Sequence, residues 1–367
     1  MAKRNAPKLK SPYPYFGGKA RAAPLVWERL GNVQNYVEPF FGSGAVALQR
    51  PHHPKTETFN DLYSFVPNFW RAVTADPEKV AYYADNPVVE VDMHARHLFL
   101  TNGEAAENFR LKVSSDPEYH DAKFAGWWVW GLCCWIGSGW CADGRSAQRD
   151  TLGNKRGVLN DGTPDQSEKR PVIDNGSRGA VNMGRPQLAD AYDIGRGVNA
   201  MRSLPTCAER QRWLVEWFGR LRDRFRLARF CCGDWARVCT SRSVLTRLGV
   251  TGVFLDPPYH ASTGRRMGLY PKDSKDVSTL VGRWALKWGD DPRMRICVAG
   301  LDGEHTPLES AGWTCESWDA PGGYNNRTAN GKANRLAERL WFSPNCLRPA
   351  PARDLFSFIH GWSEAES

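Results

Sequence analysis

An apolar run that stops at an acid and two prolines is the feature that most limits how this chain can fold. Residues 253–255 are all apolar, and the tetrapeptide Asp256-Pro257-Pro258-Tyr259 follows them directly. Proline cannot continue a strand ladder, so the run predicts a buried strand that ends at Leu255. Ligands of open α/β sheets bind at the carboxyl ends of strands, where we expect the acid and the ring to lie. A strand-ending turn without chemistry is the alternative interpretation.

A second motif lies far upstream, at residues 35–46, with the sequence NYVEPFFGSGAV. It predicts a short strand, a turn containing glycines, and a helix beginning near Ala45. The glycines let the backbone approach a ligand closely. A dinucleotide site of the G-x-G-x-x-G type requires a third glycine, which is missing here. The acid Glu38 at the strand end suits a cationic ligand, such as the sulfonium and ammonium groups of S-adenosylmethionine.

Together and in this order, the two motifs resemble those of the Dam-type DNA adenine-N6 methyltransferases, also called the D12 class or alpha group. The resemblance covers about residues 11–75 and 215–345. It implies a three-layer α/β fold, with the seven-stranded, mostly parallel sheet of S-adenosylmethionine-dependent methyltransferases. It also implies a discontinuous catalytic domain at 11–65 and 215–345, a mainly helical or irregular DNA-recognition insert at 66–214, and tails at 1–10 and 347–367.

The resemblance implies that S-adenosylmethionine is the cofactor and that Asp61 binds its ribose hydroxyls. Asp234 would accept a hydrogen bond from its adenine amino group, and Lys19 would neutralise its carboxylate or a substrate phosphate. The alternative for Asp61 and Asp234 is that each caps a helix beginning at the next residue. The complete set of expected cofactor-binding residues is Tyr15, Phe16, Gly17, Lys19, Glu38, Pro39, Phe40, Phe41, Gly42, Ser43, Gly44, Asp61, Gly233, Asp234, Trp235 and Asp256.

The reaction implied is methyl transfer to N6 of an adenine in double-stranded DNA, catalysed by Asp256, Pro257, Pro258 and Tyr259. Asp256 and the carbonyl of Pro257 would each accept one hydrogen bond from the amino group. Tyr259 would stack on the base. The target base must leave the helix, because its N6 atom cannot be reached inside a stacked duplex.

Recognition of a DNA site is expected from a segment rich in arginine, glycine and polar residues at 141–206, because the reactive motifs contain nothing that reads sequence. Its acids are interleaved with its bases, so a spacer of balanced charge is the alternative. A tryptophan-rich stretch just before it predicts a core helix, although Trp140 follows its glycines and is a candidate for stacking on DNA. The expected DNA-binding residues are Trp140, Arg145, Arg149, Arg265, Arg266 and Arg327.

Composition agrees with this interpretation. The chain has 367 residues, a net charge of +9 and a pI of about 9.1, which is compatible with a nucleic-acid partner. Its ten cysteines include no C-x-x-C pair, so we expect reduced thiols and no metal site. No long apolar stretch predicts a membrane span. We expect a cytoplasmic monomer, either in a bacterial cell or as a phage protein acting there.

Other functions stay open at this point. Methylation of cytosine N4 uses the same chemistry, although by family analogy aspartate at position 256 favours adenine and serine would favour cytosine. A DNA-binding relative without activity would not need the intact Asp256, Tyr259, Gly42 and Gly44. A nicotinamide oxidoreductase is opposed by the missing third glycine. A methylase acting on RNA or on protein glutamine is the remaining alternative.

Overall fold

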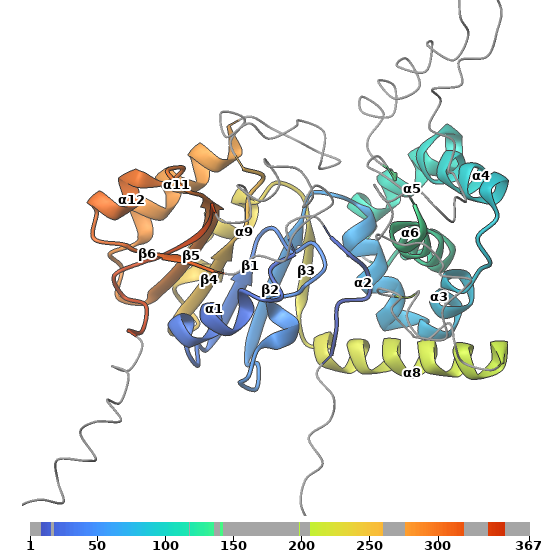
Figure 1. The fold of residues 1–367 in the computed structure, drawn as a ribbon, viewed down its shortest axis with the longest axis horizontal. Coiled ribbons are helices and arrows are strands. Elements are labelled where there is room, and N and C mark those ends of the chain that lie inside the picture. The colour runs from blue at the N-terminus through green and yellow to red at the C-terminus, as the bar shows by residue number, and fades with distance from the viewer. Residues whose placement is uncertain are drawn as a thin grey trace, which may run out of the picture.

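A seven-stranded sheet forms one part of the computed structural model, and a body of helices lies beyond one edge of it (Figure 1). The structure describes residues 9–15, 18–116, 118–135, 140–141, 198, 206–259, 276–318 and 337–348. The strands are β1 (Asn35–Glu38), β2 (Thr56–Asp61), β3 (Arg229–Cys232), β4 (Thr251–Leu255), β5 (Met294–Leu301), β6 (Thr314–Ser317) and β7 (Glu338–Phe342). The helices are α1 (Ala23–Leu30), the 3-10 helix η1 (Ala47–Gln49), α2 (Phe65–Ala75), α3 (Pro77–Ala84), α4 (Glu90–Thr101), α5 (Gly103–Ser115), α6 (Ala122–Cys134), α8 (Cys207–Phe225), α9 (Ala236–Cys239), α10 (Arg242–Leu245), α11 (Val277–Trp288) and α12 (Thr306–Ser310).

The strand order is β3-β2-β1-β4-β5-β7-β6, in which β7 pairs antiparallel with both of its neighbours and the other pairs are parallel. From β1 the chain moves outward to β2 and β3, then returns to place β4 on the other side of β1. The carboxyl ends of β1 and β4 therefore flank the point where the strand order reverses, which is where open α/β sheets bind ligands. The predicted α/β fold with a seven-stranded sheet is confirmed.

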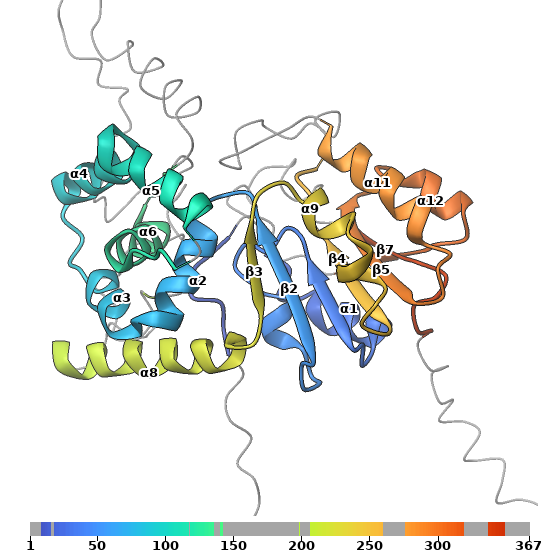
Figure 2. The ribbon, with the colours of Figure 1, turned by 180° about the vertical axis from the view of Figure 1, so that it is seen from behind.

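Both faces of the sheet are covered, because successive side chains of a strand point to opposite faces. In β4, Phe254 belongs to the core on the side of α1 and α2, whereas Val253 and Leu255 belong to the core on the side of α9 to α12. The same alternation occurs in β1, where Tyr36 and Val37 lie in the two different cores. The three layers predicted from the sequence follow from this alternation, and Figure 2 shows α9, α11 and α12 on the second face.

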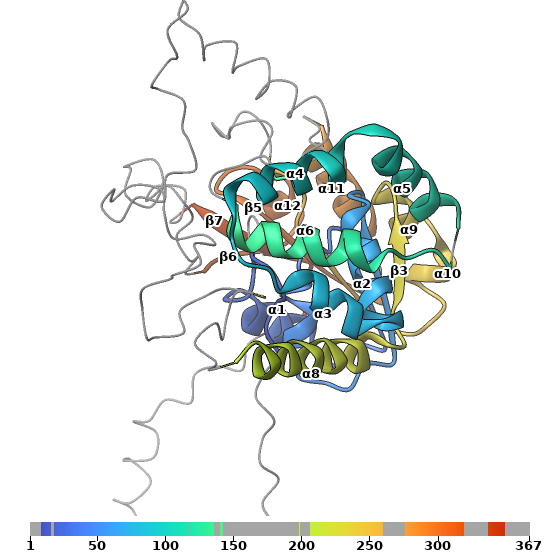
Figure 3. The same ribbon diagram turned by 90° about the vertical axis from the view of Figure 1, so that its right-hand side faces the viewer.

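The helical body consists of α2 to α6 with α8, and it adjoins the β3 edge of the sheet through contacts of α2 with β2 and β3. Figure 3 shows α6 near its centre, with α3 and α8 on one side and α4 on the other. Its tryptophans Trp128 and Trp130 are fully buried, as the prediction of a core helix requires. Thr206 caps the start of helix α8, since its hydroxyl accepts a hydrogen bond from the Glu209 N–H.

Two details of the structure differ from the sequence predictions. The helix expected near Ala45 is only the 3-10 turn η1, because the chain reaches Pro51 and the residue before a proline is pushed into an extended conformation. The expected domain boundary between residues 214 and 215 falls inside α8, whose apolar face packs against α2 and α3. The division into a catalytic domain and an insert stays a prediction.

Candidate active site

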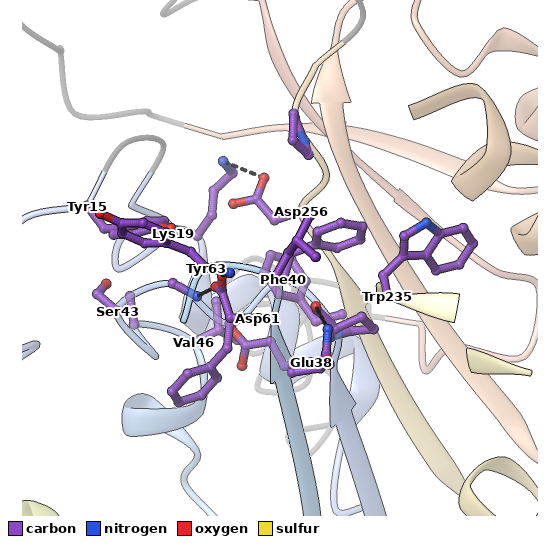
Figure 4. A pocket seen from close by; sticks show the side chains of 18 of the residues that line it. Tyr15, Lys19, Glu38, Phe40, Ser43, Val46, Asp61, Tyr63, Trp235 and Asp256 are labelled. Carbon is purple, nitrogen blue, oxygen red and sulfur yellow. Dashed lines mark hydrogen bonds and ion pairs between the residues drawn. The ribbon is translucent and has the colours of Figure 1, made fainter. Parts of the chain in front are cut away.

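A single pocket collects most of the predicted cofactor and catalytic residues at the carboxyl ends of β1 to β4 (Figure 4). It encloses about 900 Å³ of empty space, which includes its open mouth. The predicted residues that line it are Tyr15, Lys19, Glu38, Pro39, Phe40, Phe41, Gly42, Ser43, Asp61, Gly233, Asp234, Trp235, Asp256 and Pro258.

The glycine turn after β1 is tightly packed, and this explains both of its glycines. Gly42 has a φ of +50°, and a Cβ added to it would lie 2.6 Å from the Tyr15 ring. Gly44 has a φ of +67°, and a Cβ there would lie 2.6 Å from the Phe41 ring. Gly44 is not part of the pocket wall, but it lets Phe41 turn inward and stack on Phe59 with ring centroids 4.3 Å apart. Of the two adjacent phenylalanines, Phe40 is therefore the more accessible to a ligand.

Backbone groups hold Asp61 at the end of β2. One carboxylate oxygen accepts the Gly42 N–H at 2.9 Å, and the other accepts the Tyr63 N–H at 2.9 Å. The first bond ties the glycine turn to β2. The helix expected directly after Asp61 begins only at Phe65, so Asp61 binds the turn before the helix rather than capping it.

The neighbouring residue Asn60 joins three strands at this edge. Its amide nitrogen donates to the Pro39 carbonyl at 3.1 Å and to the Gly233 carbonyl at 2.9 Å. Asn60 is 2% exposed, and its Oδ1 atom has no hydrogen-bond partner among the described residues. Buried acceptors are nearly always satisfied, and Asn60 is one of the residues that line the pocket. The sequence analysis missed Asn60, although its position beside Asp61 at the end of a strand was a usable signal.

Asp234 and Trp235 follow β3 and form the far wall. Asp234 is exposed, and its Oδ1 accepts the Ala236 N–H at 2.9 Å at the start of α9. This bond closes the turn before α9, whose N-cap residue is Trp235, and it uses one of the two carboxylate oxygens of Asp234. Trp235 is buried and stacks against Phe40, with ring centroids 6.1 Å apart and an angle of 28° between the ring planes.

Glu38 at the end of β1 is 2% exposed and is one of the residues that line the pocket. Its Oε2 accepts the Tyr36 hydroxyl at 2.9 Å. Burial raises the pKa of Glu38 well above its ordinary value, although the Tyr36 hydrogen bond opposes that effect. Glu38 is thus a largely interior acid whose charged form is disfavoured by burial.

The acid of the tetrapeptide after β4 forms an ion pair with Lys19, whose Nζ lies 2.9 Å from Asp256 Oδ1 (Figure 4). Lys19 is 2% exposed. Burial raises the pKa of Asp256 from 3.8 to about 6, and Lys19 opposes this rise while Glu338 and Glu304 add to it. Asp256 is therefore ionised at neutral pH and becomes protonated in mildly acidic solution.

Tyr259 lies beside this ion pair rather than in the pocket wall. Its hydroxyl accepts from Lys19 Nζ at 2.8 Å and donates to Glu338 Oε2 at 2.6 Å. The sequence analysis missed Glu338, because it belongs to β7, 79 residues further along the chain.

Trp140 does not project from the surface as a DNA-stacking residue would. It is 6% exposed, its ring lies over Gly131, and its indole N–H donates to the Trp128 carbonyl at 3.0 Å. The ring of Trp140 is therefore packed in the core of this structure, and its expected role in stacking on DNA stays a prediction. The other expected DNA-binding residues, Arg145, Arg149, Arg265, Arg266 and Arg327, lie outside the described residues, as do Phe16 and Gly17.

Residues 15–115 match the family model of the D12 class N6 adenine-specific DNA methyltransferase. The match indicates an enzyme that methylates adenine in DNA, and the predicted family is confirmed over that segment. The segment holds the glycine turn and Asp61, whereas Asp256 and Tyr259 lie beyond it. No curated protein matches the chain.

Other features of the described residues bear on the expected partners. No described helix is both long and apolar enough to span a membrane. In the part of the chain that the structure covers, no three His, Cys, Asp or Glu side chains gather into a possible metal site. All ten cysteines lie in the described ranges, and the structure assigns none of them to a disulfide.

Proposed function

We propose that this adenine DNA methyltransferase transfers a methyl group from S-adenosylmethionine to N6 of an adenine flipped out of double-stranded DNA at a specific site. The observation that carries the proposal is that the loops after β1, β2 and β3 share one pocket with Asp256 and Pro258 after β4. A cofactor in the first part of that pocket would meet a substrate amino group in the second. The family match supports the same chemistry, since members of the family generally depend on S-adenosylmethionine.

The acceptor groups and aromatic rings of the pocket fit S-adenosylmethionine. The two carboxylates Asp61 and Asp234 are acceptors suited to ribose hydroxyls and an adenine amino group, and the Phe40 and Trp235 rings are apolar surfaces for a flat base. The unsatisfied Asn60 Oδ1 offers a further acceptor. Glu38 adds a buried acid to the pocket wall, next to the glycine turn. When bound, this cofactor supplies a methyl group attached to a positively charged sulfur.

The chain's own residues prepare the adenine amino group for the reaction. We propose that Asp256 accepts one N6–H hydrogen bond and that the Pro257 carbonyl accepts the other. Two acceptors draw the nitrogen toward tetrahedral geometry, so its lone pair is less delocalised into the ring and can form the new bond to carbon. The acceptors help most in the transition state, when the nitrogen becomes positively charged. The proton leaves N6 afterwards, and Asp256 need hold it only briefly before it passes to solvent.

Tyr259 would stack on the flipped base. The residue is 9% exposed, and its hydroxyl accepts a hydrogen bond from Lys19 and donates one to Glu338. A ring fixed before the base arrives does not have to be ordered by binding, so less of the binding free energy is lost.

The experiment that tests the proposal is analysis of DNA from cells that lack adenine methylation of their own. The wild-type chain and an Asp256→Ala variant are expressed, and the DNA is hydrolysed for mass spectrometry of its nucleosides. We expect N6-methyladenine with the wild type only, and mapping of the modified bases should show one short sequence. N4-methylcytosine, or N6-methyladenine with both proteins, would contradict the proposal.

A further inference from the structure

We propose that Glu338 is a positioning residue for the reactive motif: it fixes the Tyr259 hydroxyl and shares Lys19 with Asp256. The inference rests on the roles proposed above for Asp256 and Tyr259. Glu338 is the first residue of β7, and nothing in the sequence around it marks it as functional.

The topology of the sheet brings Glu338 to the reactive edge. Strand β7 runs antiparallel to β5, and its first residue pairs with Leu301, the last residue of β5. The beginning of β7 therefore lies at the same edge of the sheet as the end of β4, where Asp256 follows. A parallel strand in this position would place its first residue at the opposite edge, far from the pocket.

Hydrogen bonds then fix the ring of Tyr259. The hydroxyl donates to Glu338 Oε2 at 2.6 Å and accepts from Lys19 Nζ at 2.8 Å. The ammonium also lies 5.2 Å from the centre of the Tyr259 ring. A hydroxyl with both a donor and an acceptor partner holds its ring in one orientation, as a surface that must receive a base requires.

Charge sharing links Glu338 to Asp256. Lys19 Nζ lies 2.9 Å from Asp256 Oδ1 and 3.6 Å from Glu338 Oε2, and the two carboxylate side chains are 18% and 15% exposed. One ammonium therefore serves two partly buried carboxylates. Because Glu338 also attracts Lys19, it weakens the electrostatic attraction between Lys19 and Asp256. Asp256 can therefore more readily accept a hydrogen bond from the amino group of the base.

The charges around Asp256 provide a test that distinguishes a positioning role of Glu338 from a purely structural one. Lys19 lowers the pKa of Asp256, whereas Glu338 and then Glu304 raise it. Glu38, from the end of β1, is also close enough to interact electrostatically with Asp256. Removing the charge of Glu338 should therefore lower the pKa of Asp256, while the charges on Lys19, Glu304 and Glu38 remain.

The test is a double-mutant cycle on the full chain with unmethylated duplex DNA. Glu338→Gln removes the charge, Tyr259→Phe removes the hydroxyl but keeps the ring, and the third variant combines them. Each single change should slow single-turnover methyl transfer by about tenfold, and the double change should be little worse than the slower single variant. In addition, the acid limb of kcat/KM should move to lower pH in Glu338→Gln.

A matched control is Asp302→Asn, which removes a carboxylate from the loop after β5. Asp302 pairs with Arg339, the residue next to Glu338, at 3.2 Å, and its side chain is 64% exposed. This variant should retain the wild-type rate and pH profile. If Glu338→Gln does not fold, Tyr259→Phe still removes the hydrogen bond between Tyr259 and Glu338, because it deletes the donating hydroxyl. A wild-type rate of methyl transfer in Tyr259→Phe would then overturn the inference.

The outcomes separate this inference from the proposed function. Wild-type rate and acid limb in Glu338→Gln, together with an inactive Asp256→Ala, would overturn the role of Glu338 alone. Rate losses that multiply in the double variant would also overturn it, because they would show that Glu338 and Tyr259 act independently. Activity in Asp256→Ala would instead overturn the proposed function.

Discussion

The two halves of the pocket hold their acids in different ways. In the cofactor half, formed by the ends of β1, β2 and β3, Asp61 and Asp234 accept hydrogen bonds from backbone N–H groups. In the reactive half, formed by the end of β4, the start of β7 and Lys19, Asp256 is held by a side-chain ammonium that it shares with Glu338. Backbone donors are fixed by the fold, whereas a shared ammonium can change partners. The difference suits a cofactor site that stays constant and a reactive acid that must accept a new hydrogen bond in each turnover.

The largest expected effect comes from removing the reactive acid. Asp256→Ala should lower the single-turnover rate of methyl transfer by about a thousandfold, because the amino group loses its charged acceptor. Asp256→Asn keeps an acceptor oxygen and should recover part of that loss. Cofactor affinity, measured by calorimetry, should change little in either variant. A large loss of cofactor affinity would mean that the two halves are not separate.

The matching change in the cofactor half is Asp61→Asn. It removes a charged acceptor of two backbone bonds and of the proposed ribose hydroxyls, so the Kd for S-adenosylmethionine should rise by roughly tenfold to a hundredfold. DNA affinity should stay near the wild-type value. Asp234→Asn is the control, with a smaller effect because Asp234 is exposed. An unchanged cofactor affinity in Asp61→Asn would leave this aspartate with a structural role only.

The smallest effect is a dependence on pH that belongs to the reactive half. The pKa of Asp256 is about 6, above its ordinary value, because the group is buried. Below that pH the carboxyl is protonated and is a poorer acceptor, so kcat/KM should fall by about tenfold for each further pH unit. Asp256→Asn carries no titrating group at this position and should lack this limb. If kcat/KM of Asp256→Asn falls in the same way at low pH, the titration belongs to another residue.

The core of the helical body shows what sequence patterns predict well. A run of tryptophans predicted a core helix, and α6 buries Trp128 and Trp130 completely. Trp140 was harder, because its position after a glycine-rich stretch fits a surface loop equally well. Its burial depends on Gly131, which has no side chain and so leaves space for the ring. That contact joins residues nine positions apart in a non-periodic segment, so no local pattern reveals it.

By itself, the sequence determined the strands β1 and β4, the order of the two motifs, and the acids Glu38 and Asp256 at the ends of those strands. Those features depend on local physics: proline ends a strand, glycine permits a turn, and alternating apolar residues bury two faces. Only the tertiary structure decided that Lys19, Asp256, Tyr259 and Glu338 form one hydrogen-bonded group. The reason is that Glu338 reaches the site through the antiparallel direction of β7, and strand direction is set by packing of the whole sheet.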